Sequence, residues 1–281
     1  MRVHLVDGTF ELFRCFHGAP RATAADGAEV GAVRGLLATL LKLLRQPEVT
    51  HVAVAVDRAL PPRDAGGDPL AAQHGLAAEA IRALGLTIWP MVRRFQADDA
   101  LASGAVRFAR EPAVEQVVVC TPDKDLAQVV QGSRVVLLDR VRERVTDEEG
   151  VRARFGVPPA AIPDLLSLAG DPADGLPGVP GFGRKTAAAL LARFGTLEAI
   201  PLDPARWEGL VRGAPRLAQV LAEHHDEALL QKALCTLVTD VPLVESLDAL
   251  RWEGPRRARL EAFCARVGAP ELLERVPRWR S

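Results

Sequence analysis

The sequence contains no tyrosine, few cysteines and no long apolar run. Its four cysteines show neither C-x-x-C pairing nor the spacing of zinc ligands, which excludes a disulfide framework and a zinc site. The longest apolar stretch, residues 35–44, is interrupted by Lys42 and is much shorter than the roughly 20 residues that span a bilayer. Met1 leads straight into a strand-like segment instead of a basic start and an apolar targeting block. We therefore expect a cytoplasmic protein with no membrane partner.

The chain also lacks an excess of either charge, with 35 basic and 36 acidic residues and a net charge of −1. This balance gives no attraction of the whole molecule to nucleic acid. It leaves room for a local attraction wherever bound cations cancel carboxylates. The hydrophobic fraction of 48% and the charged fraction of 25% are those of an ordinary globular protein. A chain of 281 residues can form one large core, or one core and a smaller module.

Short valine-rich runs alternate with helical patterns in the first half of the chain. Runs that are apolar on both faces are typical of parallel strands covered by helices on each side. The pattern predicts a doubly wound, mainly parallel α/β sheet followed by a helical region. The expected strands are residues 3–6, 52–56, 117–120 and 135–138, with 86–89 as a further candidate, and the expected helices are residues 33–44, 71–84, 97–109 and 124–131.

Aspartates gather where the apolar strands end, and one more pair precedes a glycine-rich segment. Because the carboxyl ends of parallel strands share one edge of the sheet, we expect the strand-end carboxylates to lie there together. Crowded carboxylates repel one another unless divalent cations with oxygen ligands neutralise them. The pattern therefore predicts metal-dependent phosphodiester chemistry. The strand-end aspartates are Asp7, Asp57, Asp98, Asp99, Asp123 and Asp125, and the further pair is Asp171 and Asp174.

A simpler interpretation exists for each aspartate taken alone. Acidic side chains at helix starts interact favourably with the helix dipole. Residues 121–125 also look like a helix start, with Thr121 as the cap and Pro122 at the first helical position. This interpretation accounts less readily for the whole set on one edge.

The glycine-rich segment predicts a phosphate-binding turn. Gly178, Gly181 and Gly183 permit a tight turn with outward-facing N–H groups, and Arg184 and Lys185 then open a helix over residues 184–194. The N-terminus of such a helix attracts anions, so a nucleic-acid phosphate is the expected ligand. Carbonyl groups of the turn could also coordinate a monovalent cation such as K⁺. The alternative is a plain turn between two packed helices.

Taken together, these segments resemble the 5′-3′ exonuclease and flap endonuclease family, which includes the nuclease domain of bacterial DNA polymerase I. Five blocks follow in the family's order over about residues 1–240. They are Leu-Val-Asp-Gly at 5–8, Ala-Val-Asp at 55–57, Ala-Asp-Asp at 97–99, Thr-Pro-Asp-Lys-Asp-Leu at 121–126 and the run 170–186. The resemblance implies a PIN-like catalytic domain over residues 1–157. A helix-three-turn-helix DNA-binding module with C-terminal helices would occupy residues 158–281.

The resemblance also implies roles for individual residues. It implies two Mg²⁺ or Mn²⁺ ions held by carboxylates, and a hairpin that grips the backbone of duplex DNA. In this sequence Asp57 and Asp98 look like ligands of a first metal, with Asp7 beside them. Asp123, Asp125 and Asp171 look like ligands of a second, with Asp99 and Asp174 in support, and Gly178, Gly181, Gly183, Arg184, Lys185 and Thr186 match the hairpin.

These roles imply a metal-dependent 5′-3′ exonuclease or structure-specific 5′ nuclease that hydrolyses DNA and acts as a monomer. One cation would lower the pKa of a water, and a pair roughly 3.5–4 Å apart would stabilise the attacking and leaving oxygens. Lys124 or Arg63 could add positive charge at the transition state. For Lys124, a solvated lysine at a helix start is the simpler interpretation.

Two features depart from the family pattern. Gln96 stands where the family usually has a glutamate, and an amide brings no charge to a metal. After Pro61-Pro62-Arg63 the long basic and aromatic arch of the family is missing, because residues 59–70 are too short to form it. A catalytically weak or inactive DNA-binding protein is therefore the main alternative. A haloacid dehalogenase-type phosphotransferase, suggested only by Val-Asp-Gly-Thr at 6–9, and a single-domain ribonuclease are weaker ones.

Overall fold

The computed structural model describes residues 1–57, 69–91 and 94–280, and the chain forms two compact units. Unit 1 comprises Met1–Thr121 and Val238–Ser281, whereas unit 2 comprises Pro122–Leu237. In the sequence, unit 2 is therefore an insertion between the two segments of unit 1. The predicted boundary after residue 157 divides the sequence in a different way and stays a prediction.

Four parallel strands form the sheet of unit 1, in the order β3-β2-β1-β4. All of β1 after Arg2 is buried, and so is all of β2 before Asp57. Strands buried on both faces need apolar residues at every position, which explains the continuous valine-rich runs. The predicted parallel sheet is confirmed, including its candidate strand at 86–89. The strands are β1 (Arg2–Asp7), β2 (His51–Asp57), β3 (Thr87–Met91) and β4 (Gln116–Cys120).

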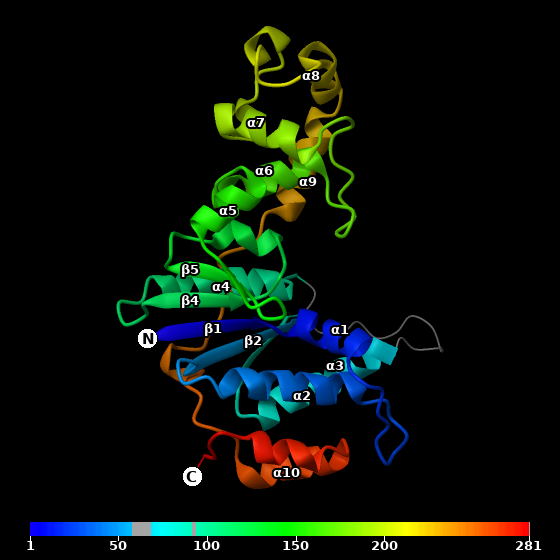
Figure 1. Ribbon diagram of the computed structural model, residues 1–281, viewed down its shortest axis with the longest axis vertical. Coiled ribbons are helices and arrows are strands. Elements are labelled where there is room, and N and C mark those ends of the chain that lie inside the picture. The colour runs from blue at the N-terminus through cyan, green and yellow to red at the C-terminus, as the bar shows by residue number, and fades with distance from the viewer. Residues whose placement is uncertain (58–68, 92–93, 281) are drawn as a thin grey trace. The chain divides into compact units, whose positions relative to one another are not determined.

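Helices cover this sheet and bury the leucine-rich stripe expected from the sequence. Helix α4 packs against all four strands, while α1 packs along α2 and contacts β2 (Figure 1). The predicted helices at 33–44, 71–84 and 97–109 correspond to α2, α3 and α4. The helices are α1 (Gly8–Gly18), α2 (Gly31–Leu44), α3 (Pro69–Ala83), α4 (Ala97–Ala109) and α10 (Arg257–Arg266), with short 3₁₀ helices η5 (Asp248–Leu250) and η6 (Pro270–Arg275).

The chain passes from β1 into α1 without a connecting loop, and Gly8 makes this possible. A Cβ atom at Gly8 would lie 2.5 Å from Val56 Cγ1 and 2.8 Å from the carbonyl oxygen of Ala55. Only glycine lets the start of α1 approach β2 this closely. The same approach fixes Asp7, which precedes Gly8 and is paired in register with Ala55.

The C-terminal segment returns to the sheet of unit 1. The Trp252 N–H donates to the carbonyl of Thr50 (2.8 Å), and its indole Nε1–H donates to the carbonyl of Leu84 (2.8 Å). The indole of Trp89 in β3 donates to Glu245 Oε2 at 2.9 Å. These long-range bonds join residues that no local sequence pattern connects.

Unit 2 is helical apart from one antiparallel pair of strands. Helix α6 packs against α7 and α9, and Ser167 Oγ on α6 donates to the carbonyl of Ala228 on α9 at 2.9 Å. Buried Asp164 accepts from the Leu197 N–H (2.7 Å) and pairs with Lys232 Nζ (2.7 Å). The elements are η1 (Asp125–Val129), β5 (Val135–Asp139), β6 (Arg144–Thr146), α5 (Glu148–Phe155), η2 (Pro159–Ala161), α6 (Ile162–Ala169), α7 (Arg184–Phe194), η3 (Leu197–Ala199), η4 (Pro204–Trp207), α8 (Ala214–Glu223) and α9 (His225–Cys235).

The helix start predicted at Thr121 is wrong. The segment forms only the 3₁₀ helix η1, which begins at Asp125, and Lys124 occupies its N-cap position. The buried Thr121 hydroxyl donates instead to Asp7 Oδ2 at 2.9 Å. A hydrogen bond to a carboxylate on a neighbouring strand thus replaces the local cap that the sequence suggested.

Over the described ranges, no helix combines the length and apolar character that crossing a membrane requires.

The close approach at Gly8 leads to a stability prediction. Gly8→Ala should lower the free energy of unfolding by about 1–3 kcal/mol, since the new methyl group overlaps the backbone and side chains of β2. Gly18→Ala is the matched control on the same helix, because a Cβ there meets nothing within 4 Å. Urea unfolding of both variants measures the difference. Equal stability of the two would show that β2 yields to the methyl group without cost.

Candidate metal and nucleic-acid sites

Two predicted site residues end neighbouring parallel strands in unit 1. Asp7 is the last residue of β1 and also caps α1, where it accepts a hydrogen bond from the Phe10 N–H at 2.8 Å. Asp57 is the last residue of β2. Their shared sheet edge follows from the parallel pairing of β1 with β2, as the sequence predicted.

Hydrogen bonds fix the orientation of the Asp57 carboxylate. Its Oδ2 accepts from Thr9 Oγ1 at 3.0 Å, and its Oδ1 accepts from the Ala97 N–H at 2.8 Å. The Thr9 hydroxyl in turn accepts from the Asp57 N–H at 2.8 Å. Sequence reasoning missed Thr9, although it lies two residues after Asp7. A threonine hydroxyl therefore orients each of the two carboxylates. Thr121 donates to Asp7, and Thr9 donates to Asp57.

The start of α4 brings Asp98 and Asp99 to the same unit. Asp98 is half-buried in the first helical turn. Asp99 accepts from the Gln96 N–H through Oδ2 and from the Val238 N–H through Oδ1, both at 2.9 Å. Asp99 thus caps its own helix and holds the start of the returning C-terminal segment. Gln96, the residue that departs from the family pattern, is exposed immediately before α4.

A second acidic group lies in unit 2. Carboxylate oxygens of Asp125, Asp171 and Asp174 lie within 4.8 Å of one another. Asp123 joins them through the chain, since its Oδ1 accepts from the Asp125 N–H at 2.9 Å. Three carboxylates converging at this distance form a donor set that suits a hard divalent cation such as Mg²⁺ or Mn²⁺.

Lys124 lies among these carboxylates and is not the solvated lysine of the simpler interpretation. Its side chain is 16% exposed, and its ammonium group pairs with Asp171 and, at 3.2 Å, with Asp174. One positive charge thus faces two negative ones. The excess negative charge that remains is a condition that a bound cation would relieve.

Asp125 carries the clearest sign of this excess. Burial, and then the negative charges of Asp123 and Asp174, raise its pKa to about 7, against the opposing effect of Lys124. Its Oδ1 atom is buried and has no hydrogen-bond partner among the described residues. A buried, partnerless carboxylate oxygen facing other carboxylates fits a metal ligand better than a purely structural residue.

Two glycines shape the loop that carries Asp171 and Asp174. Gly170 and Gly178 have φ values of 75° and 69°, and a Cβ on Gly178 would lie 2.4 Å from the Gly170 nitrogen. The Gly178 N–H donates to Gln231 Oε1 at 2.9 Å. The expectation that this N–H faces outward is therefore wrong, because a side chain of α9 takes it to close the loop.

The other end of the hairpin presents an exposed helix start, at which the anion site stays a prediction. Gly183 caps α7, the first turn of α7 carries no acidic residue, and Arg184 and Lys185 are exposed there. Gly181 is also exposed, while Thr186 is half-buried. An exposed helix start flanked by two cations favours a phosphate group.

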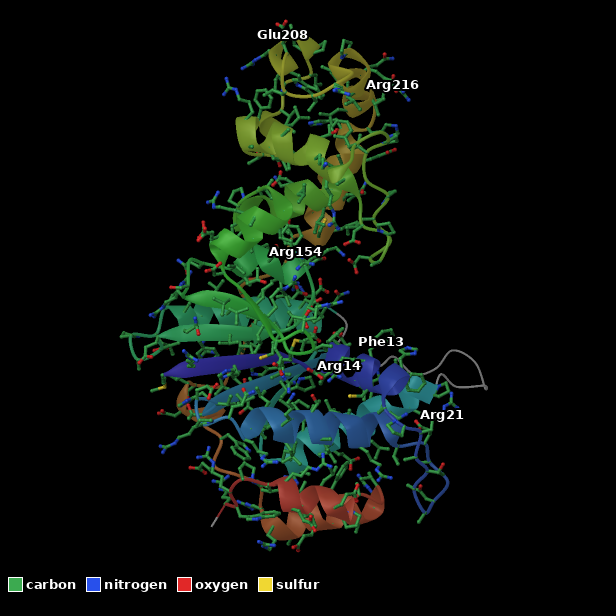
Figure 2. All side chains as sticks on the ribbon, in the orientation of Figure 1. Phe13, Arg14, Arg21, Arg154, Glu208 and Arg216 are labelled. Atoms are coloured by element: carbon green, nitrogen blue, oxygen red, sulfur yellow. The ribbon has the colours of Figure 1, made fainter. Side chains whose placement is uncertain are left out.

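A basic neighbourhood that the sequence analysis missed extends this surface. Partial burial of the guanidinium, followed by the positive charges of Arg144 and Arg184, lowers the pKa of Arg154. Arg154 is exposed on α5 (Figure 2), and its guanidinium lies 4.8 Å from the ring centre of Phe155. The positive charges of arginines from β6, α5 and α7 thus influence one another, which sequence spacing could not indicate.

Arg63 and the shortened arch lie in the range 58–68, outside the described residues. The predicted site residues that the structure describes fall into two groups. Asp7, Asp57, Asp98 and Asp99 belong to unit 1, whereas Asp123, Lys124, Asp125, Asp171, Asp174 and the hairpin residues belong to unit 2.

Comparison with known proteins accounts for both parts of the chain. Residues 2–156 match the family model described as the 5′-3′ exonuclease N-terminal resolvase-like domain, and residues 157–258 match the 5′-3′ exonuclease C-terminal SAM fold. The chain thus combines a resolvase-like, PIN-like α/β domain with a SAM-like helical domain. It belongs to the 5′-3′ exonuclease family, and the predicted resemblance is confirmed.

Curated relatives and solved structures agree with this assignment. DNA polymerase I of Pseudomonas aeruginosa is 36% identical over 92% of this chain, and that of Bacillus caldotenax is 31% identical over 97%. The chain spans only 30% and 32% of the lengths of these two relatives.

The fold is shared with the T5 5′-exonuclease in a structure with bound divalent metal ions. The TM-score is 0.66 at 18% identity, over 98% of this chain and 99% of that one. The fold is also shared with the catalytic core of Rad2 in complex with a DNA substrate. The TM-score is 0.65 at 15% identity, over 98% of this chain and 90% of that one.

The raised pKa of Asp125 leads to a pH prediction for the protein in EDTA. Between the unfolded pKa of 3.8 and the folded pKa of about 7, the folded state holds a proton that the unfolded state has lost. The stability from this group is therefore present at low pH and is lost as the pH rises through 7. Asp125→Asn cannot titrate and should show a smaller fall in melting temperature between pH 5 and pH 8 than the parent protein. A parallel fall in both proteins would contradict the raised pKa.

Proposed function

We propose that this chain is a metal-dependent 5′-3′ nuclease that hydrolyses phosphodiester bonds of DNA at or near 5′ ends. The convergence of Asp125, Asp171 and Asp174, with a buried oxygen of Asp125 lacking a partner, is the observation that carries the proposal. Membership of the 5′-3′ exonuclease family gives this acidic group a chemical context.

We assign a metal-binding role to each acidic group in its own unit. In unit 1, Asp57 and Asp98 would serve as ligands, with Asp7 beside them. In unit 2, Asp123, Asp125 and Asp171 would serve as ligands, with Asp174 in support. The support that Asp99 would give to the second metal stays a prediction. Mg²⁺ or Mn²⁺ fits these all-oxygen donors best. The two-metal mechanism, a K⁺ ion at the hairpin and a monomeric state stay predictions.

The chain's own residues prepare this chemistry. When bound, the cations supply Lewis acidity toward the phosphate and the attacking water. Thr9 and the Ala97 N–H hold the Asp57 carboxylate in one orientation, so that it loses little freedom on binding a ligand. The Lys124 ammonium offsets part of the negative charge of Asp171 and Asp174, which would otherwise repel the phosphate of a substrate.

DNA would be held through its backbone by the hairpin and the start of α7. Arg184 and Lys185 supply exposed positive charge, and Arg144 and Arg154 belong to the same electrostatic neighbourhood. Contacts of this kind position a duplex without reading its sequence. Because of Gln96 and the short arch, we expect the chain to prefer other kinds of DNA end than the family usually does. We do not expect it to thread a long 5′ flap.

Cleavage of labelled 5′-flap, nicked, overhang and single-stranded DNA with Mg²⁺ or Mn²⁺ tests the proposal. Asp57→Asn and Asp125→Asn each remove one charge from one acidic group and keep the side-chain shape. Each should lower the cleavage rate at least about 100-fold, because loss of a metal ligand removes charge stabilisation of the transition state. Duplex affinity should stay within about threefold of the parent value.

Asp240→Asn is the matched control, because Asp240 is exposed and belongs to neither acidic group. It should cut at the parent rate. Undiminished cleavage by both site variants would refute the assignment of the carboxylates. Intact DNA binding by a parent protein that cuts none of the substrates would favour the DNA-binding alternative, with Gln96 as its leading explanation.

The hairpin leads to a prediction for binding. Arg184→Ala combined with Lys185→Ala should weaken duplex binding about equally for different sequences and reduce the salt dependence of the affinity by roughly one to two phosphate contacts. Fluorescence anisotropy at several salt concentrations in EDTA measures both. The exposed pair Lys42→Ala and Arg45→Ala on unit 1 is the charge-matched control. An unchanged salt slope would place the DNA-binding surface elsewhere.

A further inference from the structure

A pocket of about 400 Å³ lies in the C-terminal segment of unit 1 and takes no part in the proposed cleavage site. It is lined by Arg251, Trp252, Glu253, Arg278, Trp279 and Arg280. The last three of these lie beyond residue 258, where neither family model matches. The volume is in the range of pockets that hold small molecules or single nucleotides.

Two arginine–tryptophan contacts lie at this pocket, one between two lining residues and one between Trp279 and Arg257, which is outside the lining. The Arg278 guanidinium carbon lies 4.7 Å from the ring centre of Trp252, and that of Arg257 lies 4.2 Å from the ring centre of Trp279. Trp252 is 2% exposed and is held by its Nε1 bond to Leu84, so it forms a fixed base for Arg278. Arg278 also donates to the Trp252 carbonyl. Its guanidinium is thus ordered before any ligand arrives, which reduces the entropy cost of binding.

The lining carries more positive than negative charge. Three guanidinium groups face one carboxylate, that of Glu253, which pairs with Arg280 at 3.0 Å. Both partners of this pair are half-exposed, at 50% and 52%, so the ion pair is weak and easily exchanged. Arginine presents a planar set of N–H donors that matches the oxygens of a phosphate. Glu253 would then compete with an incoming anion for Arg280.

Trp279 adds a planar apolar surface beside these donors. Its side chain is half-buried, unlike that of Trp252, so part of it remains available to a ligand. Aromatic side chains next to arginines bind nucleobases by stacking, while the arginines hold the phosphate. A purely anionic ligand would not stack on the indole, and a purely apolar ligand would not bind the guanidinium groups.

We propose that this pocket binds a nucleotide, with its phosphate on Arg278 and Arg251 or Arg280 and its base on Trp279. The nucleotide is either free or part of a single strand of DNA, because the recognised chemistry is the same. This site shares no residue with the carboxylate groups and does not depend on the proposed nuclease activity.

Calorimetric titration of the full chain in EDTA tests the proposal without metal-dependent cleavage. The probes are deoxyadenosine 5′-monophosphate, inorganic phosphate and a single-stranded hexamer of deoxyadenylate. Arg278→Gln should weaken binding of all three probes about tenfold, because one charged donor set is lost. Trp279→Leu should weaken the monophosphate and the hexamer about fivefold or more and leave inorganic phosphate unchanged, while Trp279→Phe should restore most of the loss.

Glu253→Gln tests the same pocket in the opposite direction and should tighten binding of all three probes, since the competing carboxylate is removed. This variant keeps the proposal testable if the Arg278 variant fails to fold. Arg45→Gln, an exposed arginine outside the pocket, is the control and should bind like the parent. A hexamer that binds more tightly than the monophosphate, with the same dependence on Trp279, identifies a DNA strand as the ligand, and equal affinity identifies a free nucleotide.

Monophosphate binding that is unaffected by the Arg278, Trp279 and Glu253 variants would overturn the proposal. A hexamer of glutamate that binds more tightly than the deoxyadenylate hexamer, and loses affinity with Arg278→Gln, would overturn it in favour of an acidic-peptide site. Loss of cleavage by Asp57→Asn or Asp125→Asn has no bearing on either result, so the two proposals fail independently.

Discussion

The need to hold several carboxylates in place is the constraint that both units share. Unit 1 meets it with hydrogen bonds, since Asp7 and Asp57 accept from threonine hydroxyls and from backbone N–H groups. In unit 2 the ammonium group of Lys124 pairs with two carboxylates, and the raised pKa of Asp125 favours its protonated form. Hydrogen bonds fix the orientation of a carboxylate, whereas burial and neighbouring negative charges favour its protonated form. The two units therefore hold their carboxylates by different interactions, although they share one proposed kind of ligand.

The sequence was sufficient for those features that depend on local pattern. The valine-rich strands, helices α4 and α7, and the aspartates at the ends of β1 and β2 were all predictable, because burial on both faces of a parallel sheet leaves a continuous apolar run. Features that depend on distant partners were not predictable. Thr121 has the identity of a helix cap but bonds to Asp7, and the Gly178 N–H is taken by Gln231.

The same distinction applies to charge. Lys124 has the sequence context of a solvated helix-start residue, yet its partners, Asp171 and Asp174, lie 47 and 50 residues further along the chain. The basic neighbourhood of Arg144, Arg154 and Arg184 combines a strand and two helices. No spacing rule links such residues. A family resemblance can assign roles to aspartates within motifs, but it is silent about the residues that orient and neutralise them.

The insertion of unit 2 within unit 1 sets the order in which the two units can be completed during synthesis. Unit 2 is one continuous stretch and has all its residues once Leu237 has left the ribosome. Unit 1 at that moment still lacks Trp252, whose bonds to Thr50 and Leu84 tie the C-terminal segment to the sheet, and Glu245, the partner of Trp89. Apolar surface that this segment later covers is exposed in the meantime, a condition under which chains associate wrongly. The middle of the chain thus becomes a finished unit first, and the first segment waits for the last residues of the chain.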